Sequence, residues 1–239
     1  QLWLGDCLEL MDNIPDNSVD MILADLPYGT TKEKWDIIIP FEPLWEQYNR
    51  IKKINSPVIL FGRNPFFAKL ILSNEKSFKY EIIWDKNAAT DFAGANMKPI
   101  TVHENLAVFC DGKISYNRIN DEGFKPYSDK RKTKMSSNMG AVGLVKREPF
   151  ENRTSRTPTT IRRYFPDNRK GLGSSLHPTQ KPISLLDWII NSYSIEGNLV
   201  VDNTMGSGST GVSAKKNNRK FIGIEKEKKY YDIAIERLR

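Results

Sequence analysis

The chain has 239 residues, with 39% hydrophobic and 27% charged side chains and a net charge of +7, which suits one α/β domain with an insertion. Its two cysteines, Cys7 and Cys110, are too few for a disulfide framework or a thiolate zinc site, and no apolar run approaches the roughly 18 residues that suggest a membrane span. These two features predict a cytoplasmic protein. The sequence begins at Gln1 without an initiator Met or a signal peptide, so we expect some N-terminal residues to be missing.

Short apolar runs in the first half of the chain predict buried strands at residues 19–24, 57–61, 80–84 and 106–109. Between these runs, apolar residues recur with the spacing of a helix. One such pattern covers residues 66–72, and an earlier one consists of Leu44, Trp45, Tyr48 and Ile51. The first predicted strand runs into Asp25-Leu26-Pro27-Tyr28-Gly29. This motif leaves a carboxylate and an aromatic ring where a buried strand ends.

Periodicity fades over residues 117–175, which are rich in Gly, Pro, Ser, Thr, Lys and Arg and predict an irregular insertion. From Arg118 to Leu176 there are 14 lysine and arginine residues against 6 acidic ones, which leaves a net charge of −1 on the rest of the chain. A basic segment with interspersed aromatic residues favours a nucleic-acid contact over a merely solvated loop, and Arg162 and Arg163 are candidate phosphate ligands. The aromatic residues are Tyr127, Phe150, Tyr164 and Phe165.

The last part of the chain has the order of a βαβ unit. A helical pattern with Leu185, Leu186, Ile189 and Ile190 precedes a predicted strand at residues 199–202. A glycine turn at residues 205–210, a helix at 209–216, a strand at 221–225 and a last helix at 230–238 follow. Together with the alternation in the first half, this order predicts an α/β fold with a Rossmann-like, doubly wound, mostly parallel sheet.

The glycine turn predicts a site for a nucleotide-like ligand. Gly206 and Gly208 lack the Cβ that would obstruct a ligand, and the helix beyond them presents unpaired N–H groups. The turn lacks the third glycine of a dinucleotide fingerprint and the lysine of a P-loop, so NAD and ATP are poorer interpretations. Glu225, at the end of the next strand, can accept hydrogen bonds from both hydroxyls of a ribose.

Together and in this order, Asp25-Leu26-Pro27-Tyr28 and the turn around Gly206 resemble the catalytic motif and the S-adenosylmethionine loop of amino-group DNA methyltransferases. The segment His177-Pro178-Thr179-Gln180-Lys181-Pro182 matches a motif that lies beside the methionine end of their cofactor. Gly5-Asp6-Cys7 resembles their adenine-binding turn, in which the Asp accepts the amino group of the cofactor's adenine. The resemblance covers nearly the whole chain, and the order with the catalytic motif first is that of the circularly permuted β class.

The resemblance implies a class I methyltransferase fold, bacterial or phage-encoded, with S-adenosylmethionine as cofactor and double-stranded DNA as partner. Residues 1–116 would form the catalytic half, 117–175 the target-recognition insertion and 176–239 the cofactor-binding half. Catalytic roles fall to Asp25, Pro27 and Tyr28. Cofactor contacts fall to Asp6, Cys7, His177, Lys181, Asp202, Thr204, Gly206, Ser207, Gly208 and Glu225. A homodimer and a companion restriction endonuclease, as in restriction-modification systems, are left open.

Two positions depart from the family pattern. Asn203-Thr204 stands where the family usually has Pro-Phe, so the resemblance implies only backbone or hydroxyl contacts there. Leu26 replaces the commoner first Pro of Asp-Pro-Pro-Tyr. A metal site is not expected, because His103 has only one other histidine in the chain to accompany it.

The catalytic motif suits chemistry on a base amino group. Such an amino group is a poor nucleophile because its lone pair is delocalised into the ring, so two acceptors must draw the nitrogen toward sp³ character. Asp25 supplies one acceptor and, by family resemblance, the carbonyl beside Pro27 supplies the other. Tyr28 is the candidate for stacking on a flipped base. Thr30 and Trp35 are candidate lining residues of the pocket, although for Trp35 the interpretation as a core aromatic is favoured. Neither cysteine follows a proline, so the Pro-Cys nucleophile of cytosine-ring enzymes is absent.

We therefore predict a site-specific DNA methyltransferase that acts on adenine N6. Cytosine N4 is the nearest alternative, and Asp25 favours adenine because cytosine-N4 relatives of this class more often carry Ser there. RNA is a less favoured substrate. A non-catalytic methyltransferase-fold subunit that binds nucleic acid is the alternative of another class, and the intact Asp25, Tyr28, Gly206 and Gly208 argue against it.

Overall fold

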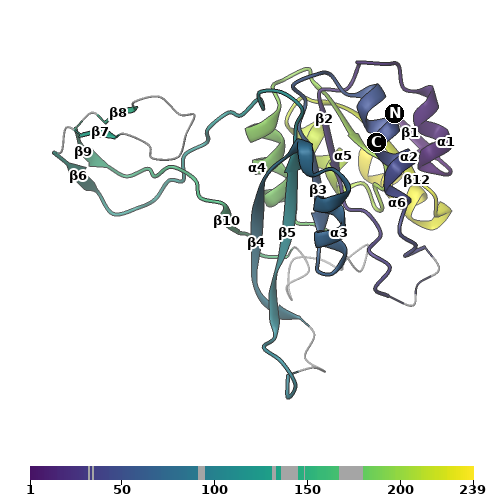
Figure 1. The fold of residues 1–239 in the computed structure, drawn as a ribbon, viewed down its shortest axis with the longest axis horizontal. Coiled ribbons are helices and arrows are strands. Elements are labelled where there is room, and N and C mark those ends of the chain that lie inside the picture. Colours follow the sequence, from purple (N-terminus) through teal and green to yellow (C-terminus); the bar gives the residue numbers. More distant parts are fainter. Residues whose placement is uncertain are drawn as a thin grey trace. The chain divides into compact units, whose positions relative to one another are not determined.

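The chain falls into two units in a computed structural model that describes residues 1–31, 33, 35–90, 95–130, 133–135, 145–147, 149–166 and 180–239. The first unit comprises Gln1–Asn117 and Thr160–Arg239, and the second comprises Arg118–Thr159. Figure 1 traces the elements of each unit in chain order.

The described residues of the first unit form an eight-stranded, mostly parallel sheet, as the sequence predicts. Its strands, in spatial order, are β1 (Leu2–Leu4), β12 (Lys220–Glu225), β11 (Leu199–Asp202), β2 (Met21–Ala24), β3 (Val58–Gly62), β5 (Thr101–Phe109), β4 (Phe78–Thr90) and β10 (Ile161–Arg163). The first five are parallel to one another, β5 is antiparallel to both of its neighbours, and β10 is parallel to β4.

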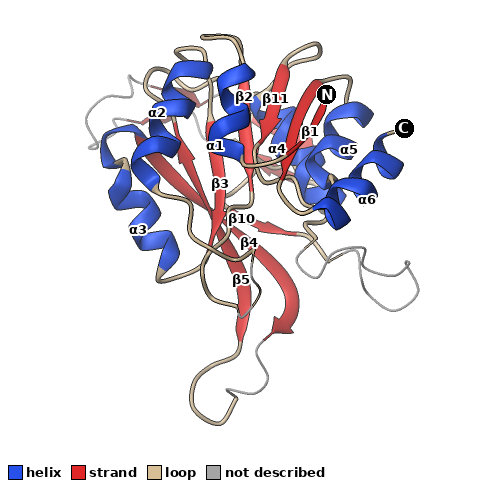
Figure 2. Ribbon diagram, turned by 90° about the vertical axis from the view of Figure 1, so that its right-hand side faces the viewer, coloured by secondary structure: helices blue, strands red, loops and turns tan. Residues whose placement is uncertain are grey.

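Helices cover both faces of this sheet (Figure 2). One face carries α1 (Cys7–Leu10), α2 (Phe41–Ile51) and α3 (Phe66–Ser73), with the short 3₁₀ turns η1 (Met11–Asn13) and η2 (Glu75–Ser77). The other face carries α4 (Ile183–Tyr193) and α5 (Ser209–Lys216), and α6 (Lys228–Leu238) contacts α5, β1 and β12. No helix among the described residues is long and apolar enough to cross a membrane.

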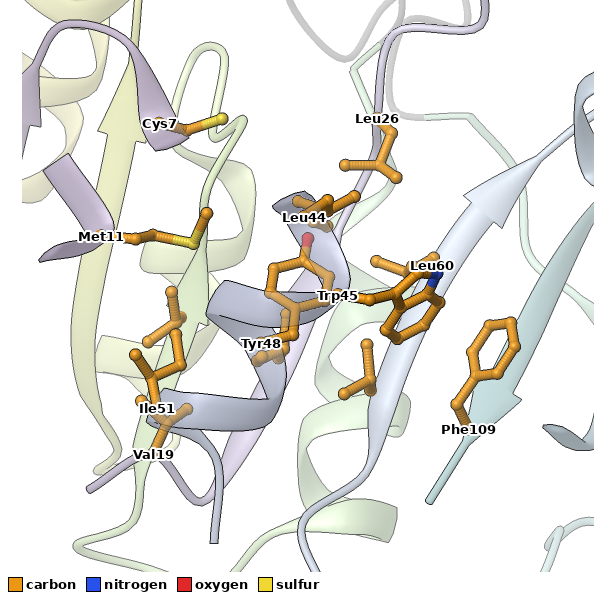
Figure 3. Close-up of a cluster of buried hydrophobic side chains, with 14 of the residues drawn as sticks. Cys7, Met11, Val19, Leu26, Leu44, Trp45, Tyr48, Ile51, Leu60 and Phe109 are labelled. Carbon is orange, nitrogen blue, oxygen red and sulfur yellow. The ribbon is translucent and has the colours of Figure 1, made fainter. Parts of the chain in front are cut away.

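The strands read as continuous apolar runs because their two faces enter two separate cores. In β2, Ile22 and Ala24 belong to one buried cluster, whereas Met21 and Leu23 belong to the other. The first cluster receives the apolar face of α2, and Figure 3 shows its side chains together with Cys7, Met11, Leu60 and Phe109. This two-sided burial holds the ends of the central strands in place.

The second unit contains short antiparallel strands. The sequence predicts an irregular insertion over residues 117–175 and does not predict these strands. Strand β6 (Tyr127–Asp129) pairs with β9 (Phe150–Arg153), and β7 (Thr133–Met135) pairs with β8 (Val145–Arg147). Strands of three or four residues are too short to show apolar alternation, so the sequence carries no periodic signal for them. The exposed Arg153 and Arg156 lie over the rings of Phe150 and Phe124 at 4.0 and 4.5 Å.

Strand β10 also lies within the stretch of residues 117–175, but it belongs to the sheet of the first unit. Arg162 on this strand is only 7% exposed and lies 4.4 Å from the ring centroid of Trp188. Arg163 donates a hydrogen bond from Nε to Asp85 Oδ2 at 2.8 Å. Both guanidinium groups are therefore engaged within the first unit, which weakens the case for them as free phosphate ligands.

Candidate active site

Four neighbouring parallel strands each carry a carboxylate to the same edge of the sheet. Asp6 follows β1, Glu225 ends β12, Asp202 ends β11 and Asp25 follows β2. Parallel strands present their carboxyl ends together, and the crevice outside those ends is where open α/β sheets bind ligands. A cavity of about 390 Å³ lies there, and all four carboxylates line it.

The cavity brings together most of the residues that the sequence predicts for the site. Those that line it are Asp6, Cys7, Asp25, Pro27, Tyr28, Thr30, Lys181, Asp202, Thr204, Gly206, Ser207 and Glu225. Gly208 does not line it. Its φ is +80°, and a Cβ there would lie 3.0 Å from the Cβ of Ala234, so the close approach of α5 to α6 accounts for this glycine. His177 lies outside the described residues.

The glycine turn and Glu225 form one hydrogen-bonded unit. Gly206 has a φ of +52° and donates its N–H to Glu225 Oε2 at 2.8 Å. The N–H of Glu227 donates to Glu225 Oε1 at 2.7 Å. Burial raises the pKa of the Glu225 carboxyl. These bonds orient the carboxylate and leave lone pairs on both oxygens for a ligand.

Asp6 and Asn203 also line the cavity, and hydrogen bonds hold both side chains. Asp6 Oδ1 accepts the N–H of Leu8 at 3.0 Å, which caps α1, and Oδ2 lies 3.1 Å from Lys226 Nζ. Asn203 is buried, accepts the hydroxyl of Tyr48 at 2.6 Å and donates to Cys7 Sγ at 3.5 Å. Asn203 thus fills a structural position where the related family usually has proline.

Asp202 and Thr204 connect the end of β11 to the catalytic motif. Asp202 is 3% exposed and accepts the N–H of Thr204 at 3.1 Å, and burial raises the pKa of its carboxyl to about 7. The Thr204 hydroxyl donates to the backbone carbonyl of Asp25 at 3.0 Å. A hydroxyl contact therefore joins the two motifs, although Thr204 replaces an aromatic residue.

Asp25 is held by partners on both of its oxygens. Tyr28 donates its hydroxyl to Asp25 Oδ1 at 2.5 Å, and the Lys181 ammonium donates to Oδ2. Burial raises the pKa of the Asp25 carboxyl and that of the Tyr28 hydroxyl. The Tyr28 ring stacks on Phe66, with ring centroids 5.1 Å apart and an interplanar angle of 28°.

Lys181 links Asp25 to two charged residues that sequence analysis did not select. Its Nζ lies 3.3 Å from Glu104 Oε2, and the Lys86 ammonium pairs with Glu104 Oε1. Burial acts to lower the pKa of Lys181, but the Asp25 and Glu104 carboxylates outweigh it and raise that pKa. The only signal for Glu104 and Lys86 in the sequence was that each is a charged residue beside an apolar run, Lys86 on β4 and Glu104 on β5.

Hydrogen bonds to the Asp36 carboxylate hold the loop that follows the catalytic motif. Its carboxylate accepts the N–H groups of Gly29, Thr30 and Thr31 at 2.8, 2.8 and 2.6 Å. Partial burial acts to raise the pKa of Asp36, but these bonds outweigh it and lower the pKa. Trp35 in this loop lines the cavity and lies edge-on to Tyr230, with ring centroids 6.4 Å apart. Trp35 is only partly buried, so the prediction of a core aromatic was wrong.

These features define an α/β fold with a cavity at the carboxyl ends of its parallel strands, lined by a glycine turn and four carboxylates. A family model for N6 and N4 methyltransferases, described as DNA methylase, matches residues 19–236. The chain belongs to this family of S-adenosylmethionine-dependent DNA amino-methyltransferases.

Curated relatives match nearly the whole chain. The type II methyltransferase M.HinfI of Haemophilus influenzae is 29% identical, over 98% of this chain and 67% of its own length. The DNA adenine methyltransferase YhdJ of Escherichia coli is 29% identical, over 98% of this chain and 81% of its own length.

Solved structures show the same fold at lower identity. The M1.HpyAVI–SAM complex is 22% identical with a TM-score of 0.64, covering 100% of this chain and 98% of its own. The cytosine-N4-specific PvuII DNA methyltransferase is 16% identical with a TM-score of 0.70, covering 100% of this chain and 86% of its own. Both confirm the class I methyltransferase fold.

Proposed function

We propose that this protein is a β-class enzyme that transfers a methyl group from S-adenosylmethionine to N6 of an adenine flipped out of duplex DNA. The main observation in support is that Asp25, Pro27 and Tyr28 line the same cavity as Gly206 and Glu225. Because the glycine turn and the catalytic motif share that cavity, a methyl donor and an acceptor base would meet beside Asp25.

The lining residues fit S-adenosylmethionine. A cavity of about 390 Å³ is within the usual range for small-molecule sites. Glu225 offers a carboxylate for the ribose hydroxyls, and Asp6 and Cys7 would lie against the adenine. The positive φ of Gly206 brings backbone to the cavity wall without a Cβ, and Ser207 and Thr204 supply polar groups nearby.

Asp25 would act as the acceptor that activates the amino group. An ionised carboxylate has about four lone-pair sites, so the bonds from Tyr28 and Lys181 leave room for a bond from a base amino group. S-adenosylmethionine supplies an electrophilic methyl group, and transfer forms an N–C bond from the amino lone pair while the C–S electron pair stays on sulfur. The methylated nitrogen then loses one proton, which Asp25 is placed to accept.

Tyr28 would recover part of the cost of base flipping. Extrusion of a base costs a few kcal/mol, and stacking on an aromatic ring is worth about 1–3 kcal/mol. Tyr28 lines the cavity, with one face of its ring stacked on Phe66. Its hydroxyl bond to Asp25 ties the stacking ring to the activating carboxylate.

Adenine is favoured over cytosine by Asp25 and by the relative YhdJ, which is named a DNA adenine methyltransferase. A larger purine also offers more stacking surface to Tyr28. Cytosine N4 is the second candidate, because the fold is shared with the cytosine-N4-specific PvuII enzyme. The paired-acceptor chemistry of Asp25 would serve either base.

DNA recognition is assigned to the second unit, within the basic stretch of residues 117–175. Its exposed Arg153 and Arg156, each over an aromatic ring, support a contact with DNA. A homodimer and a companion restriction endonuclease stay open predictions.

Identification of the methylated nucleoside tests this function. Duplex DNA would be incubated with the protein and S-adenosylmethionine, digested to nucleosides and analysed by mass spectrometry. We expect N6-methyladenine as the dominant product. Mainly N4-methylcytosine would overturn the adenine assignment and leave the chemistry of Asp25 standing, whereas no methylated base in DNA or RNA would favour a non-catalytic subunit.

A further inference from the structure

A buried chain of alternating charges extends from Asp25 into the sheet. It runs from Asp25 through Lys181 and Glu104 to Lys86. The side chains of Lys181, Glu104 and Lys86 are 8%, 10% and 9% exposed, whereas that of Asp25 is 25% exposed and faces the cavity. Two carboxylates and two ammonium groups make the chain electrically neutral.

Strand pairing places Glu104 in this chain. In β5, Asn105 lies opposite Gly62 at the carboxyl end of β3, and Glu104 lies opposite Trp84 of β4. Glu104 therefore stands at the edge of the sheet that carries the catalytic motif, although its own strand runs the other way. Its side chain also lines the cavity.

The consequence for Asp25 is electrostatic. Without Glu104, the whole attraction of the Lys181 ammonium would act on Asp25, which would become a weaker hydrogen-bond acceptor. With Glu104 beside it, the ammonium is shared between two carboxylates. A stronger acceptor draws the base amino group further toward sp³ character, which is the step that limits its nucleophilicity.

We propose that Glu104 is a positioning residue for methyl transfer, which shares the Lys181 ammonium with Asp25 and so keeps Asp25 a strong acceptor. The proposal rests on the proposed function of Asp25. Glu104 itself needs no contact with the base, because it acts through Lys181.

The test uses the full-length protein with Glu104→Gln, and Glu81→Gln as the matched control. Glu81 is an exposed carboxylate on the adjacent strand β4 that accepts a bond from Asn105 at 3.2 Å. We expect the single-turnover rate of Glu104→Gln to fall about tenfold or more, with S-adenosylmethionine affinity changed less than threefold. Glu81→Gln should retain the wild-type rate.

A second variant tests whether a loss of activity comes from an unpaired buried charge that destabilises the fold. Glu104→Gln leaves an uncompensated buried ammonium, whereas Glu104→Gln with Lys86→Met keeps the remaining Asp25–Lys181 pair neutral. Both variants should lose activity to a similar extent if the role of Glu104 is to share Lys181. Full activity in a folded double variant would overturn the proposal.

The titration of Asp25 gives a readout that needs neither cofactor nor DNA. The ionised Glu104 acts to raise the pKa of Asp25, so its removal should lower that pKa. The charged or titratable groups around this carboxylate are Lys181, Glu104, Tyr28, Asp202 and, through Tyr28, Arg63. Carboxyl-carbon NMR of aspartate-labelled protein, assigned with Asp25→Asn, measures the change.

Failure of this proposal and failure of the proposed function have different outcomes. If Asp25→Ala retains methyl transfer, the proposed function of Asp25 fails. If Asp25→Ala is inactive while Glu104→Gln matches Glu81→Gln in rate and in Asp25 titration, only the role of Glu104 fails. An upward shift of the Asp25 titration in Glu104→Gln would also contradict the sharing of Lys181.

Discussion

We propose separate roles for the ring and the hydroxyl of Tyr28, and two substitutions distinguish them. Tyr28→Ala removes the stacking surface, which is worth about 1–3 kcal/mol or roughly 5- to 150-fold in affinity for DNA with a flipped target base. Tyr28→Phe keeps the ring and loses only the hydroxyl that donates to Asp25. Fluorescence of a base analogue at the target position measures flipping, and equal losses in the two variants would contradict a stacking role.

The raised pKa of Asp202 gives a prediction for stability. The carboxyl titrates near 3.8 when unfolded and near 7 when folded, so the folded chain binds the proton more tightly. Its contribution to stability is therefore fully present below pH 4 and is lost as the pH rises to about 7. Asp202→Asn should gain stability relative to wild type between pH 5 and pH 8, by at most about 3 kcal/mol, because only about two pKa units of the shift fall in that window. Denaturant unfolding at the two pH values checks this, and a pH-independent difference would contradict it.

At the scale of elements, the glycine turn and strand β12 should control cofactor affinity. Glu225→Gln removes the charge that would accept the ribose hydroxyls, and a hydrogen bond to a charged group is worth about 1.5–3 kcal/mol. We expect at least tenfold weaker binding of S-adenosylmethionine by calorimetry, without DNA. Glu236→Gln, an exposed carboxylate on α6, is the control. Unchanged affinity in a folded Glu225→Gln would remove Glu225 from the cofactor site.

The sequence predicted the elements that contribute most to the two cores. Strands β2, β3 and β11 are apolar runs whose two faces enter two cores, and helices α2, α4 and α5 each bury apolar side chains in one of these cores. The strands β1 and β10 have three residues each and lie at the edges of the sheet, where little apolar pattern is required. Their pairing depends on partners far along the chain.

The candidate site was predicted where a motif carries its own chemistry, as at Asp25 and Glu225. Glu104 and Lys86 were missed because their contacts arise only on folding, which brings Glu104 beside both Lys181 and Lys86. The burial of Arg162 could not be predicted for the same reason, since its contact with Trp188 joins two elements that are distant in the sequence.

At the scale of the whole molecule, the uneven charge should govern DNA affinity. Phosphate contacts release counterions, so affinity should fall steeply with salt. Lys125 and Lys130 are exposed in the second unit, and neutralising both should reduce the salt slope by up to about two. The exposed Lys69 and Lys76 of the first unit form the control pair. If the two pairs behave alike, the second unit is not the main DNA contact.

Residues from the first and last parts of the chain line one cavity. The carboxylate of Asp25 comes from the first half of the chain, whereas Thr204, Gly206 and Glu225 come from its last forty residues. A substitution at Asp25 should therefore separate methyl transfer from cofactor binding.

The most direct test is single-turnover methyl transfer to DNA by Asp25→Ala, with S-adenosylmethionine affinity measured in parallel. Asp16→Ala, which removes a surface carboxylate paired with Arg50, is the control. We predict that Asp25→Ala folds, binds the cofactor with far less loss in affinity than in rate, and transfers methyl groups at well under a tenth of the wild-type rate. A rate above about a tenth, a loss of less than about 1.4 kcal/mol, would contradict the role of Asp25 in activating the base amino group.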